Sequence, residues 1–289
     1  MTMHPGARLR ASIEQGVVQI PGAFNALVAR AIARTGFQAC YVSGGATANV
    51  AGVPDVGLLT LTEVTRTIRE IVDASGIPVI ADADTGYGEV EAAIRTVVEY
   101  ERAGAAALHV EDQVFPKRCG HLDGKTIVPC DEMATKVQAM VDHRESSDFM
   151  IIARTDARHV TGLEDAIQRA NTYREAGAEA IFPEGLTTED EFAEFAKGSP
   201  GLLLANMTEF GKTPHITASK FEQLGYSMVI YPLSVMRLAM AAVTTGLQGL
   251  KEEGSFASAE SAMQTRKALY ELLDYQPGEV WTAPSNRSS

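Results

Sequence analysis

The chain has 289 residues, is 45% apolar and carries a formal net charge of −12. That length is ordinary for one α/β barrel, and the apolar share is enough for a sizeable core. The acidic balance argues against a nucleic-acid-binding surface and against adhesion to an anionic membrane. An anionic substrate would therefore need a local positive site, because the overall field of the protein repels it.

Export signals and disulfide patterns are missing from the sequence. The N-terminus lacks the apolar core of a signal peptide, and no stretch approaches the ~18 apolar residues of a membrane helix. Cys40, Cys119 and Cys130 form an odd set without the spacing of a metal site. We therefore expect free thiols and a cytoplasmic protein, since disulfides are rare in reducing compartments.

Short apolar runs alternate with amphipathic stretches along the chain. The runs predict strands at 17–22, 39–44, 78–84, 106–112, 149–156, 180–184, 201–207 and 228–232. The amphipathic stretches predict helices at 25–35, 61–74, 89–102, 131–144, 163–175, 188–196, 217–223 and 233–252. Nearly all-apolar strands indicate a parallel sheet covered by helices on both faces.

Eight strand–helix units predict a (β/α)8 TIM-type barrel in a single domain over 1–289. The alternative is an open doubly wound sheet, although no Gly-x-Gly-x-x-Gly follows the first strand. Thr60 or Thr62 and Asp131 are candidate helix N-caps. One more helix is expected at 258–273, so C-terminal helices occupy about 233–275 and must pack on their own barrel or on a neighbour's.

Polar side chains end most of the predicted strands, where barrels carry their active sites. These positions are Ser43-Gly44-Gly45, Asp82, Asp84, Glu111, Arg154, Glu184 and Asn206. Six such sets are more than helix capping needs. The sequence therefore predicts an active site at this rim.

Asp82 and Asp84 end one strand, and alternate strand residues face the same side. Two neighbouring carboxylates repel each other unless a cation neutralises them, and oxygen ligands suit Mg²⁺ or Mn²⁺. The alternative is that one aspartate caps a helix while the other meets a lysine. Glu111, at the end of the next strand, favours the metal site.

Residues 117–121 read Lys117-Arg118-Cys119-Gly120-His121 and lie in a long loop after the fourth strand. Two cations and an imidazole beside a thiol favour its ionisation, so Cys119 is a candidate for proton transfer. The alternative is a solvated basic loop with an incidental cysteine. Cys40 and His109 lie inside predicted strands and are expected in the interior.

Three further residues of the rim suit a carboxylate-bearing substrate. Arg154 either pairs with a protein acid or binds a substrate carboxylate with its forked guanidinium. Glu184 and Asn206 either position substrate groups or support their neighbours. Ser43-Gly44-Gly45 forms a turn or a loop whose backbone N–H groups approach an anion closely.

These motifs together resemble the isocitrate lyase / phosphoenolpyruvate mutase superfamily. They are Ser43-Gly44-Gly45, VPDVG (53–57), DADTGYG (82–88), HVEDQ (109–113), KRCGH (117–121), ARTDA (153–157), FPE (182–184), ANMTEFG (205–211), YPLS (231–234) and MQTR (263–266). KRCGH with DADTGYG is specific for the superfamily, and the cysteine favours its lyase branches. YPLS and MQTR favour the short methylisocitrate lyase type over full-length isocitrate lyase.

The resemblance implies a barrel with a swapped last helix, in a tetramer built from dimers. It implies Mg²⁺ held mainly by Asp82 and Asp84, with Glu111 nearby, and cleavage of 2-methylisocitrate to pyruvate and succinate. The residues it implies for substrate binding are Ser43, Gly44, Gly45, Asp55, Cys119, Gly120, Arg154, Glu184, Asn206, Thr208, Arg237 and Arg266.

For catalysis the resemblance implies Cys119 as the acid, with Lys117, Arg118 and His121 tuning its thiol. The base is Tyr41 or a carboxylate relay near the metal. After KRCGH the chain continues LDGKTIVP, which also resembles branches acting on 2,3-dimethylmalate, oxaloacetate or carboxyphosphonoenolpyruvate. The lyase chemistry is therefore better defined than the substrate.

Overall fold

A computed structural model describes residues 3–118, 120 and 124–282 of the chain. Its strands are β1 (Val18–Pro21), β2 (Cys40–Val42), β3 (Val79–Asp82), β4 (Ala107–Glu111), β5 (Met150–Thr155), β6 (Ala180–Pro183), β7 (Leu202–Asn206) and β8 (Met228–Tyr231). All pair in parallel, in the order β1-β8-β7-β6-β5-β4-β3-β2. A bridge between Gly22 and Tyr41 brings β1 to β2 and confirms the predicted (β/α)8 barrel.

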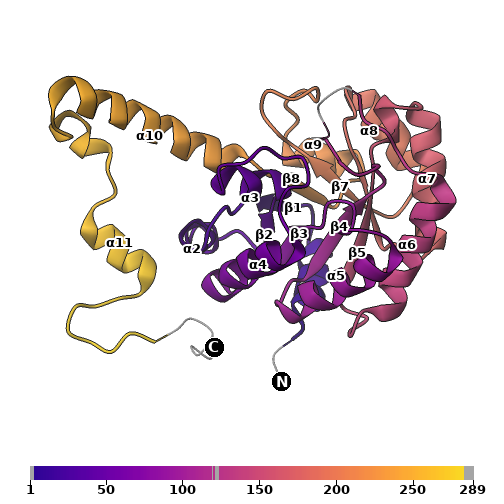
Figure 1. Cartoon of the computed structure of the whole chain (residues 1–289), viewed down its shortest axis with the longest axis horizontal. Helices are drawn as coiled ribbons and strands as arrows, with labels where there is room; N and C mark the ends of the chain where they lie inside the picture. Colours follow the sequence, from indigo (N-terminus) through magenta and orange to yellow (C-terminus); the bar gives the residue numbers. More distant parts are fainter. Residues whose placement is uncertain (1–2, 119, 121–123, 283–289) are drawn as a thin grey trace.

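The helices follow the strands in alternation. They are α1 (Pro5–Ile13), α2 (Ala26–Arg34), α3 (Gly44–Val50), α4 (Leu61–Ser75), α5 (Val90–Arg102), α6 (Cys130–His143), α7 (Leu163–Glu175), α8 (Glu189–Gly198), α9 (Ala218–Gln223), α10 (Ser234–Glu253) and α11 (Arg266–Leu273), with short 3-10 turns η1 (Ala157–His159) and η2 (Ala257–Ala262). Figure 1 shows most of them arranged around the strands. No helix among the described residues combines the length and the apolar character needed to cross a membrane.

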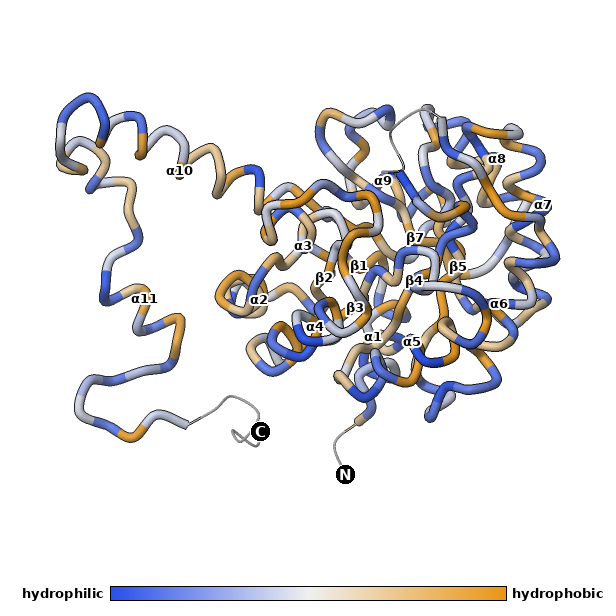
Figure 2. Tube along the Cα trace, viewed as in Figure 1, coloured by the Kyte–Doolittle hydropathy of each residue, from blue (hydrophilic) through white to orange (hydrophobic). Residues whose placement is uncertain are grey.

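Two apolar clusters hold the barrel together. The larger cluster lies between strands and helices, and the smaller one fills the barrel interior with side chains such as Ile20, Ile152 and Met228. Figure 2 shows hydrophobic residues along the strands and hydrophilic stretches on the outer helices. Leu9 of α1 is fully buried in the interior cluster, so this unpredicted helix closes one end of the barrel.

Helix boundaries follow from local capping, with three differences from expectation. Thr60 forms a complete capping box with Glu63 and so confirms the first of its two candidate caps. Asp131 is not an N-cap, because α6 already begins at Cys130 after Pro129. Ser43 caps the unpredicted short helix α3, and the helix expected at 258–273 is divided into η2 and α11.

The C-terminal helices leave the barrel instead of covering it (Figure 1). None of the residues of α10 is buried, and its exposed apolar side chains include Leu238, Met240, Val243 and Leu247. The segment contacts the barrel near α2, where Arg30 donates to the carbonyl of Leu272 over 3.0 Å. An exposed apolar helix of this length is typical of an interface.

Candidate active site

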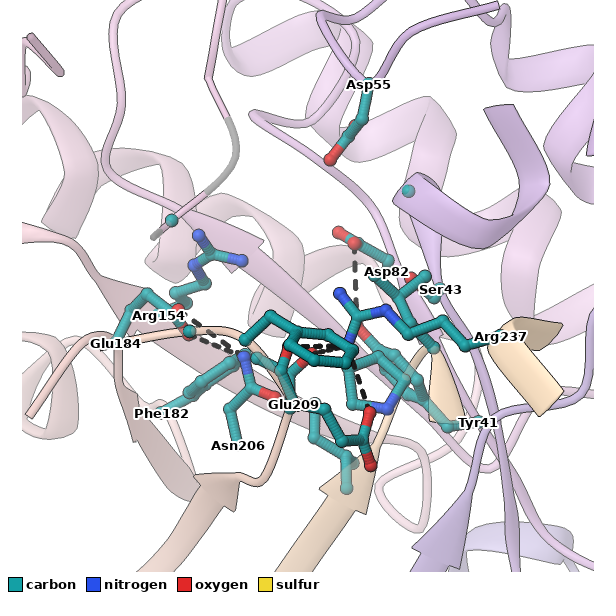
Figure 3. Close-up of a pocket in the computed structure, with 18 of the residues that line it drawn as sticks. Tyr41, Ser43, Asp55, Asp82, Arg154, Phe182, Glu184, Asn206, Glu209 and Arg237 are labelled. Carbon is teal, nitrogen blue, oxygen red and sulfur yellow. Dashed lines mark hydrogen bonds and ion pairs between the residues drawn. The ribbon is translucent and has the colours of Figure 1, made fainter. Parts of the chain in front are cut away.

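A cavity of about 270 Å³ opens at the carboxyl ends of the strands. The predicted site residues that line it are Tyr41, Ser43, Gly45, Asp55, Asp82, Lys117, Gly120, Arg154, Glu184, Asn206, Thr208 and Arg237. Figure 3 shows Arg154, Glu184 and Asn206 on one side of the cavity, facing Ser43, Asp82 and Arg237 on the other. The barrel therefore brings together residues that are nearly two hundred positions apart in the sequence.

Lys117 lies among carboxylates at the mouth of the cavity. Its Nζ is 2.5 Å from Asp55 Oδ1 and 2.7 Å from Asp84 Oδ1, and its side chain is only 3% exposed. Burial alone would lower the pKa of Lys117, but Glu111, Asp84 and the other carboxylates outweigh it and raise the pKa well above its usual range. The ammonium group therefore stays charged and balances the negative charge of these carboxylates.

Asp82 and Asp84 converge as expected, although not by strand alternation. β3 ends at Asp82, and Asp84 follows in a turn with a φ of 47°. Asp82 accepts from the backbone N–H groups of Gly44 over 3.1 Å and of Asp84 over 3.0 Å. A Cβ on Gly44 would lie 2.9 Å from Asp82 Oδ2 and 3.0 Å from Asp84 Oδ1, so only glycine fits against the pair.

The two aspartates differ in acidity. Burial and the charge of Asp82 raise the pKa of Asp84 to about 6. Burial would also raise the pKa of Asp82, but His109, Lys117 and Arg154 outweigh it and lower the pKa to about 2. The two carboxyl groups therefore lose their protons at different pH values, as expected for close carboxylates that repel each other.

Glu111 and Arg154 lie side by side on β4 and β5. Arg154 NH1 is 3.2 Å from Glu111 Oε2, and its Nε donates to Asp156 Oδ2 over 2.9 Å. Burial raises the pKa of Glu111 well above its usual range, despite the opposing charges of Arg154 and Lys117. Neither oxygen of Glu111 accepts a hydrogen bond within the described residues.

The hydroxyl of Tyr41 points at the imidazole of His109. This histidine is fully buried, which confirms the interior position predicted for it. The distance from Tyr41 OH to His109 Nε2 is 2.6 Å, and that to Asp82 Oδ2 is 3.5 Å. Burial and the charge of Asp82 raise the pKa of Tyr41 well above its usual range. Burial lowers the pKa of His109 to about 4, so the ring is neutral at pH 7.

Amide, hydroxyl and guanidinium groups complete the lining on both sides of the cavity. Asn206 Nδ2 donates to Glu184 Oε2 over 3.2 Å. Arg237 NH1 donates to Thr208 Oγ1 over 3.1 Å and is 3.0 Å from Glu209 Oε2. These contacts fix the positions of the polar groups around the cavity.

Some predicted residues lie behind or outside the cavity. Gly44, Asp84 and Glu111 form its supporting layer. The backbone N–H and carbonyl of Arg118 are bound by the side chain of Gln113. Arg266 begins α11 and lines a separate pocket with Tyr270 and with Arg34 of α2, apart from the active-site cavity, because α10 carries this segment off the barrel. Cys119 and His121 fall outside the described residues.

A divalent ion has oxygen donors available here but no complete set of protein ligands. Among the described residues, no group of three or more His, Cys, Asp or Glu side chains is arranged to hold a metal. Apart from the ion pairs of Lys117 with Asp84 Oδ1 and of Arg154 with Glu111 Oε2, Asp84 Oδ1 and both oxygens of Glu111 are buried without a hydrogen-bond partner in that part of the chain. Such oxygens suit a hard cation that keeps some of its waters.

Several residues of the site were not singled out from the sequence. Phe182, Glu209, Phe210 and Leu233 line the cavity, and Asp156 holds Arg154. Phe182, Glu209, Phe210 and Asp156 stand inside the motifs FPE, ANMTEFG and ARTDA, so the signal was present. What they contact depends on packing between distant segments.

Comparisons with known proteins agree with this geometry. The family model described as phosphoenolpyruvate phosphomutase matches residues 9–251. A probable 2-methylisocitrate lyase 1 of Corynebacterium glutamicum is 48% identical over 92% of this chain and 87% of its own length. A 2-methylisocitrate lyase of Aeropyrum pernix is 46% identical over 99% of this chain and 92% of its own length.

Solved structures show the same fold. That of 2,3-dimethylmalate lyase, titled a PEP mutase/isocitrate lyase superfamily member, is 35% identical with a TM-score of 0.88, over 94% of this chain and 92% of its own. Phosphonopyruvate hydrolase, solved with oxalate and Mg²⁺, is 31% identical with a TM-score of 0.84, over 93% and 95%. The rim of polar strand ends, the cavity and these matches together establish that the chain belongs to the phosphoenolpyruvate phosphomutase family, as a relative of the 2-methylisocitrate lyases.

Proposed function

We propose that this protein is a Mg²⁺-dependent carbon–carbon lyase that cleaves 2-methylisocitrate to pyruvate and succinate. The observation that carries the proposal is the set of three cations, Lys117, Arg154 and Arg237, that line one cavity of a chain with a net charge of −12. Each of these positioned cations can orient one carboxylate of a substrate that carries three. The identity of 46–48% to two 2-methylisocitrate lyases supports this substrate.

Substrate binding uses both walls of the cavity. The small residues Ser43, Gly44 and Gly45 let a carboxylate approach the backbone closely. The remaining proposed contacts are Asp55, Cys119, Gly120, Arg154, Glu184, Asn206, Thr208, Arg237 and, from the C-terminal segment, Arg266. A guanidinium such as that of Arg154 binds a carboxylate through two parallel hydrogen bonds.

Mg²⁺ is proposed to bind through Asp82 and Asp84, with Glu111 nearby and Mn²⁺ as a possible substitute. Asp84 Oδ1 and the Glu111 oxygens are buried with no partner among the described residues other than the cations Lys117 and Arg154, which fits a hard cation. When bound, such an ion lowers the pKa of a substrate hydroxyl and polarises the carbonyl that forms. Gly44 sets the distance between the two aspartates, and Lys117 supplies further positive charge to Asp84.

The chain's own groups then handle the protons. The proposed base is Tyr41, which would take the proton of the substrate hydroxyl as its own phenolic proton passes to Nε2 of neutral His109 over 2.6 Å; a carboxylate relay near the metal is the alternative. The C2–C3 bond breaks, its electron pair stays with the succinate fragment, and the hydroxyl-bearing carbon becomes the carbonyl of pyruvate. Arg154 and Lys117 stabilise the charge on the succinate fragment. Cys119 delivers a proton to its carbon, with Lys117, Arg118 and His121 adjusting the thiol.

A second candidate substrate is 2,3-dimethylmalate. It is favoured by the structural match to 2,3-dimethylmalate lyase, at 35% identity and a TM-score of 0.88. The cavity lining also includes the apolar side chains of Phe182, Phe210, Ile230 and Leu233, which would tolerate a methyl group in place of a carboxylate. The chemistry would be the same cleavage.

A steady-state panel separates these possibilities. Purified protein with Mg²⁺ is assayed on 2-methylisocitrate, 2,3-dimethylmalate and oxaloacetate, with pyruvate release coupled to NADH oxidation and the second product identified by chromatography. We expect the highest kcat/KM with 2-methylisocitrate and loss of activity in excess chelator. A higher kcat/KM with 2,3-dimethylmalate would replace the substrate, and full activity in chelator would remove the metal.

We further propose a cytoplasmic homotetramer, built from dimers that exchange their C-terminal helices. The exposed apolar side chains of α10 and its departure from the barrel support this arrangement. In that assembly α11 and Arg266 would pack on a neighbouring subunit. Light scattering on the purified chain tests the proposal, and a monomer at micromolar concentration would contradict it.

A further inference from the structure

Two buried charges lie just behind the cavity and have no role in the chemistry proposed above. Asp156 is fully buried directly after β5, and Lys125 is 8% exposed in the long loop before α6. Burying a cation and an anion is unfavourable unless both are paired. The groups that Asp156 and Lys125 bind show which parts of the site these two residues hold in place.

Asp156 binds two cations with its two carboxylate oxygens. Arg154 Nε donates to Oδ2 over 2.9 Å, and Arg154 NH2 donates to Oδ1 over 3.2 Å. Lys125 Nζ donates to the same Oδ1 over 2.7 Å, and it also donates to the carbonyl of Gly120. Lys125 therefore ties the backbone of Gly120 to the carboxylate that grips Arg154.

Gly120 also lies against Glu184 and Arg154, which line the cavity. A Cβ there would lie 2.5 Å from Glu184 Oε1 and 2.6 Å from Arg154 NH2. The backbone of Gly120 is thus packed directly on two cavity residues. Gly120, Lys125, Asp156 and Arg154 form a closed ring of contacts, which we call the Lys125–Asp156 ring.

The ring is anchored to the barrel by Asp112. Its Oδ1 accepts from the backbone N–H of Asp156 over 2.9 Å, and its Oδ2 accepts from Thr155 Oγ1 and Tyr173 OH, each over 2.8 Å. Burial would raise the pKa of Asp156, but Arg154 and Lys125 outweigh it and lower the pKa. Asp156 therefore stays ionised at a fixed place.

An ion pair that only stabilised the fold would not need to hold Arg154 from two sides. Arg154 is held from one side by Asp156 and from the other by Glu111, whose Oε2 is 3.2 Å from NH1, and its guanidinium lies 5.1 Å from the centre of the Phe182 ring. The remaining edge of Arg154 lines the cavity. Groups that act on a substrate need placement within about 0.5 Å, which such support provides.

We propose that Lys125 and Asp156 are positioning residues for the reaction. Asp156 orients the guanidinium of Arg154 toward the substrate, and Lys125 fixes the Gly120 backbone relative to that guanidinium. The proposal rests on the lyase function proposed above. It assigns neither residue a contact with the substrate.

Two neutral variants test the proposal. Asp156→Asn should lower kcat/KM about 100-fold and raise KM, because misplacing a binding group by about 1 Å can lose ~10²-fold. Lys125→Met should lower kcat about 10-fold with a smaller change in KM, since supporting residues commonly contribute ~10–100-fold. The matched control is Glu179→Gln, a carboxylate at the other end of the barrel that also holds two cations, Arg10 and Arg144, over 2.8 and 2.9 Å.

The double variant and a binding measurement separate positioning from a general loss of structure. If both residues act through the same ring, the double variant loses little beyond Asp156→Asn, whereas independent residues would give additive free-energy losses. Oxalate binding with Mg²⁺, measured by calorimetry, should weaken in Asp156→Asn but not in Glu179→Gln. Thermal unfolding identifies any variant that fails to fold, and Lys125→Met then carries the test.

Two results overturn the proposal. One is a folded Lys125→Met variant with kcat and KM within about 2-fold of wild type, a change too small for positioning support. The other is an additive double variant. Should the wild type cleave no substrate of the panel while oxalate binding still weakens in Asp156→Asn, the proposed lyase function fails and the positioning role remains.

Discussion

The replacement Gly44→Ala probes the proposed metal site without touching a ligand. The added Cβ would lie 2.9 Å from Asp82 Oδ2, 3.0 Å from Asp84 Oδ1 and 3.2 Å from Asp82 Cγ, all short of the 3.4 Å at which ordinary contact begins. Both carboxylates are buried and cannot move into solvent. They must therefore separate or tilt.

The expected effect falls on metal binding more than on folding. Overpacking costs about 1–3 kcal/mol, but replacing glycine by alanine within a helix returns up to ~1 kcal/mol. The free energy of unfolding should thus fall by at most about 2 kcal/mol. Displacing ligands from their supports typically weakens a metal site ~10–100-fold.

Gly45→Ala, on the same turn of α3, is the matched control for Mn²⁺ affinity alone, because Gly45 is also a proposed substrate contact. Its Cβ would approach Asp55 Oδ2 to 3.1 Å and Ser43 Oγ to an ordinary 3.6 Å, and Asp55 has a 22% exposed side chain that can shift. Mn²⁺ affinity is measured by electron paramagnetic resonance, and kcat/KM is titrated against Mg²⁺. Wild-type Mn²⁺ affinity in folded Gly44→Ala would refute the placement of the ion at Asp82 and Asp84.

Three further outcomes are expected. Cys119→Ser should fold normally, by circular dichroism, and lose ~10²-fold or more in kcat, as general acids do; near-wild-type cleavage would remove Cys119 from the mechanism. Burial would raise the pKa of Glu191, but hydrogen bonds from Arg158 and Thr187 outweigh it and lower the pKa. A carboxyl group whose pKa is lower in the folded state stabilises the fold above its unfolded pKa of about 4.3, and this contribution is lost as the pH falls through the folded pKa. The free energy of unfolding in urea should therefore vary less with pH below about 4.3 in Glu191→Gln than in wild type. Leu247→Glu, at a 56% exposed position of α10, should shift light-scattering mass toward smaller species while thermal unfolding of the barrel stays unchanged, and an intact tetramer would contradict the proposed interface.

The barrel could be predicted from the sequence because its signals are local. Each strand is an apolar run between polar segments, and Gly36, Gly104 and Gly177 follow helix ends with φ values of 95°, 89° and 100°. A positive φ strongly favours glycine at these stops. Most strands then end in the polar side chains that line the cavity, so the rim itself was also predictable.

The pairing inside the site could not be read in the same way. Lys117 was expected to tune the thiol of Cys119, and the sequence did not indicate that its Nζ also lies between Asp55 and Asp84. The contact between Lys117 and Asp55 joins positions 62 residues apart, and neither the hydrophobic periodicity nor the motif spacing indicates it. Asp84 likewise converges with Asp82 through a positive φ that the strand pattern does not indicate.

The charges around the cavity give a physical reason for the proposed divalent cation. Lys117, Arg154 and Arg237 are each held by carboxylates, so these cations are positioned but already neutralised. Among the described residues that line the cavity or pair with its cations, the acids outnumber the bases; the acids are Asp55, Asp82, Asp84, Glu111, Asp156, Glu184 and Glu209.

A substrate with three negative charges would therefore meet a local field close to neutral or negative. Positioned guanidinium and ammonium groups give orientation, but net attraction needs additional positive charge. A divalent cation at Asp82 and Asp84 would supply it, and it would also compensate ionisation of the buried Glu111. The substrate KM should accordingly rise steeply as Mg²⁺ is withdrawn, and equal substrate binding with and without Mg²⁺, by calorimetry, would refute this electrostatic account.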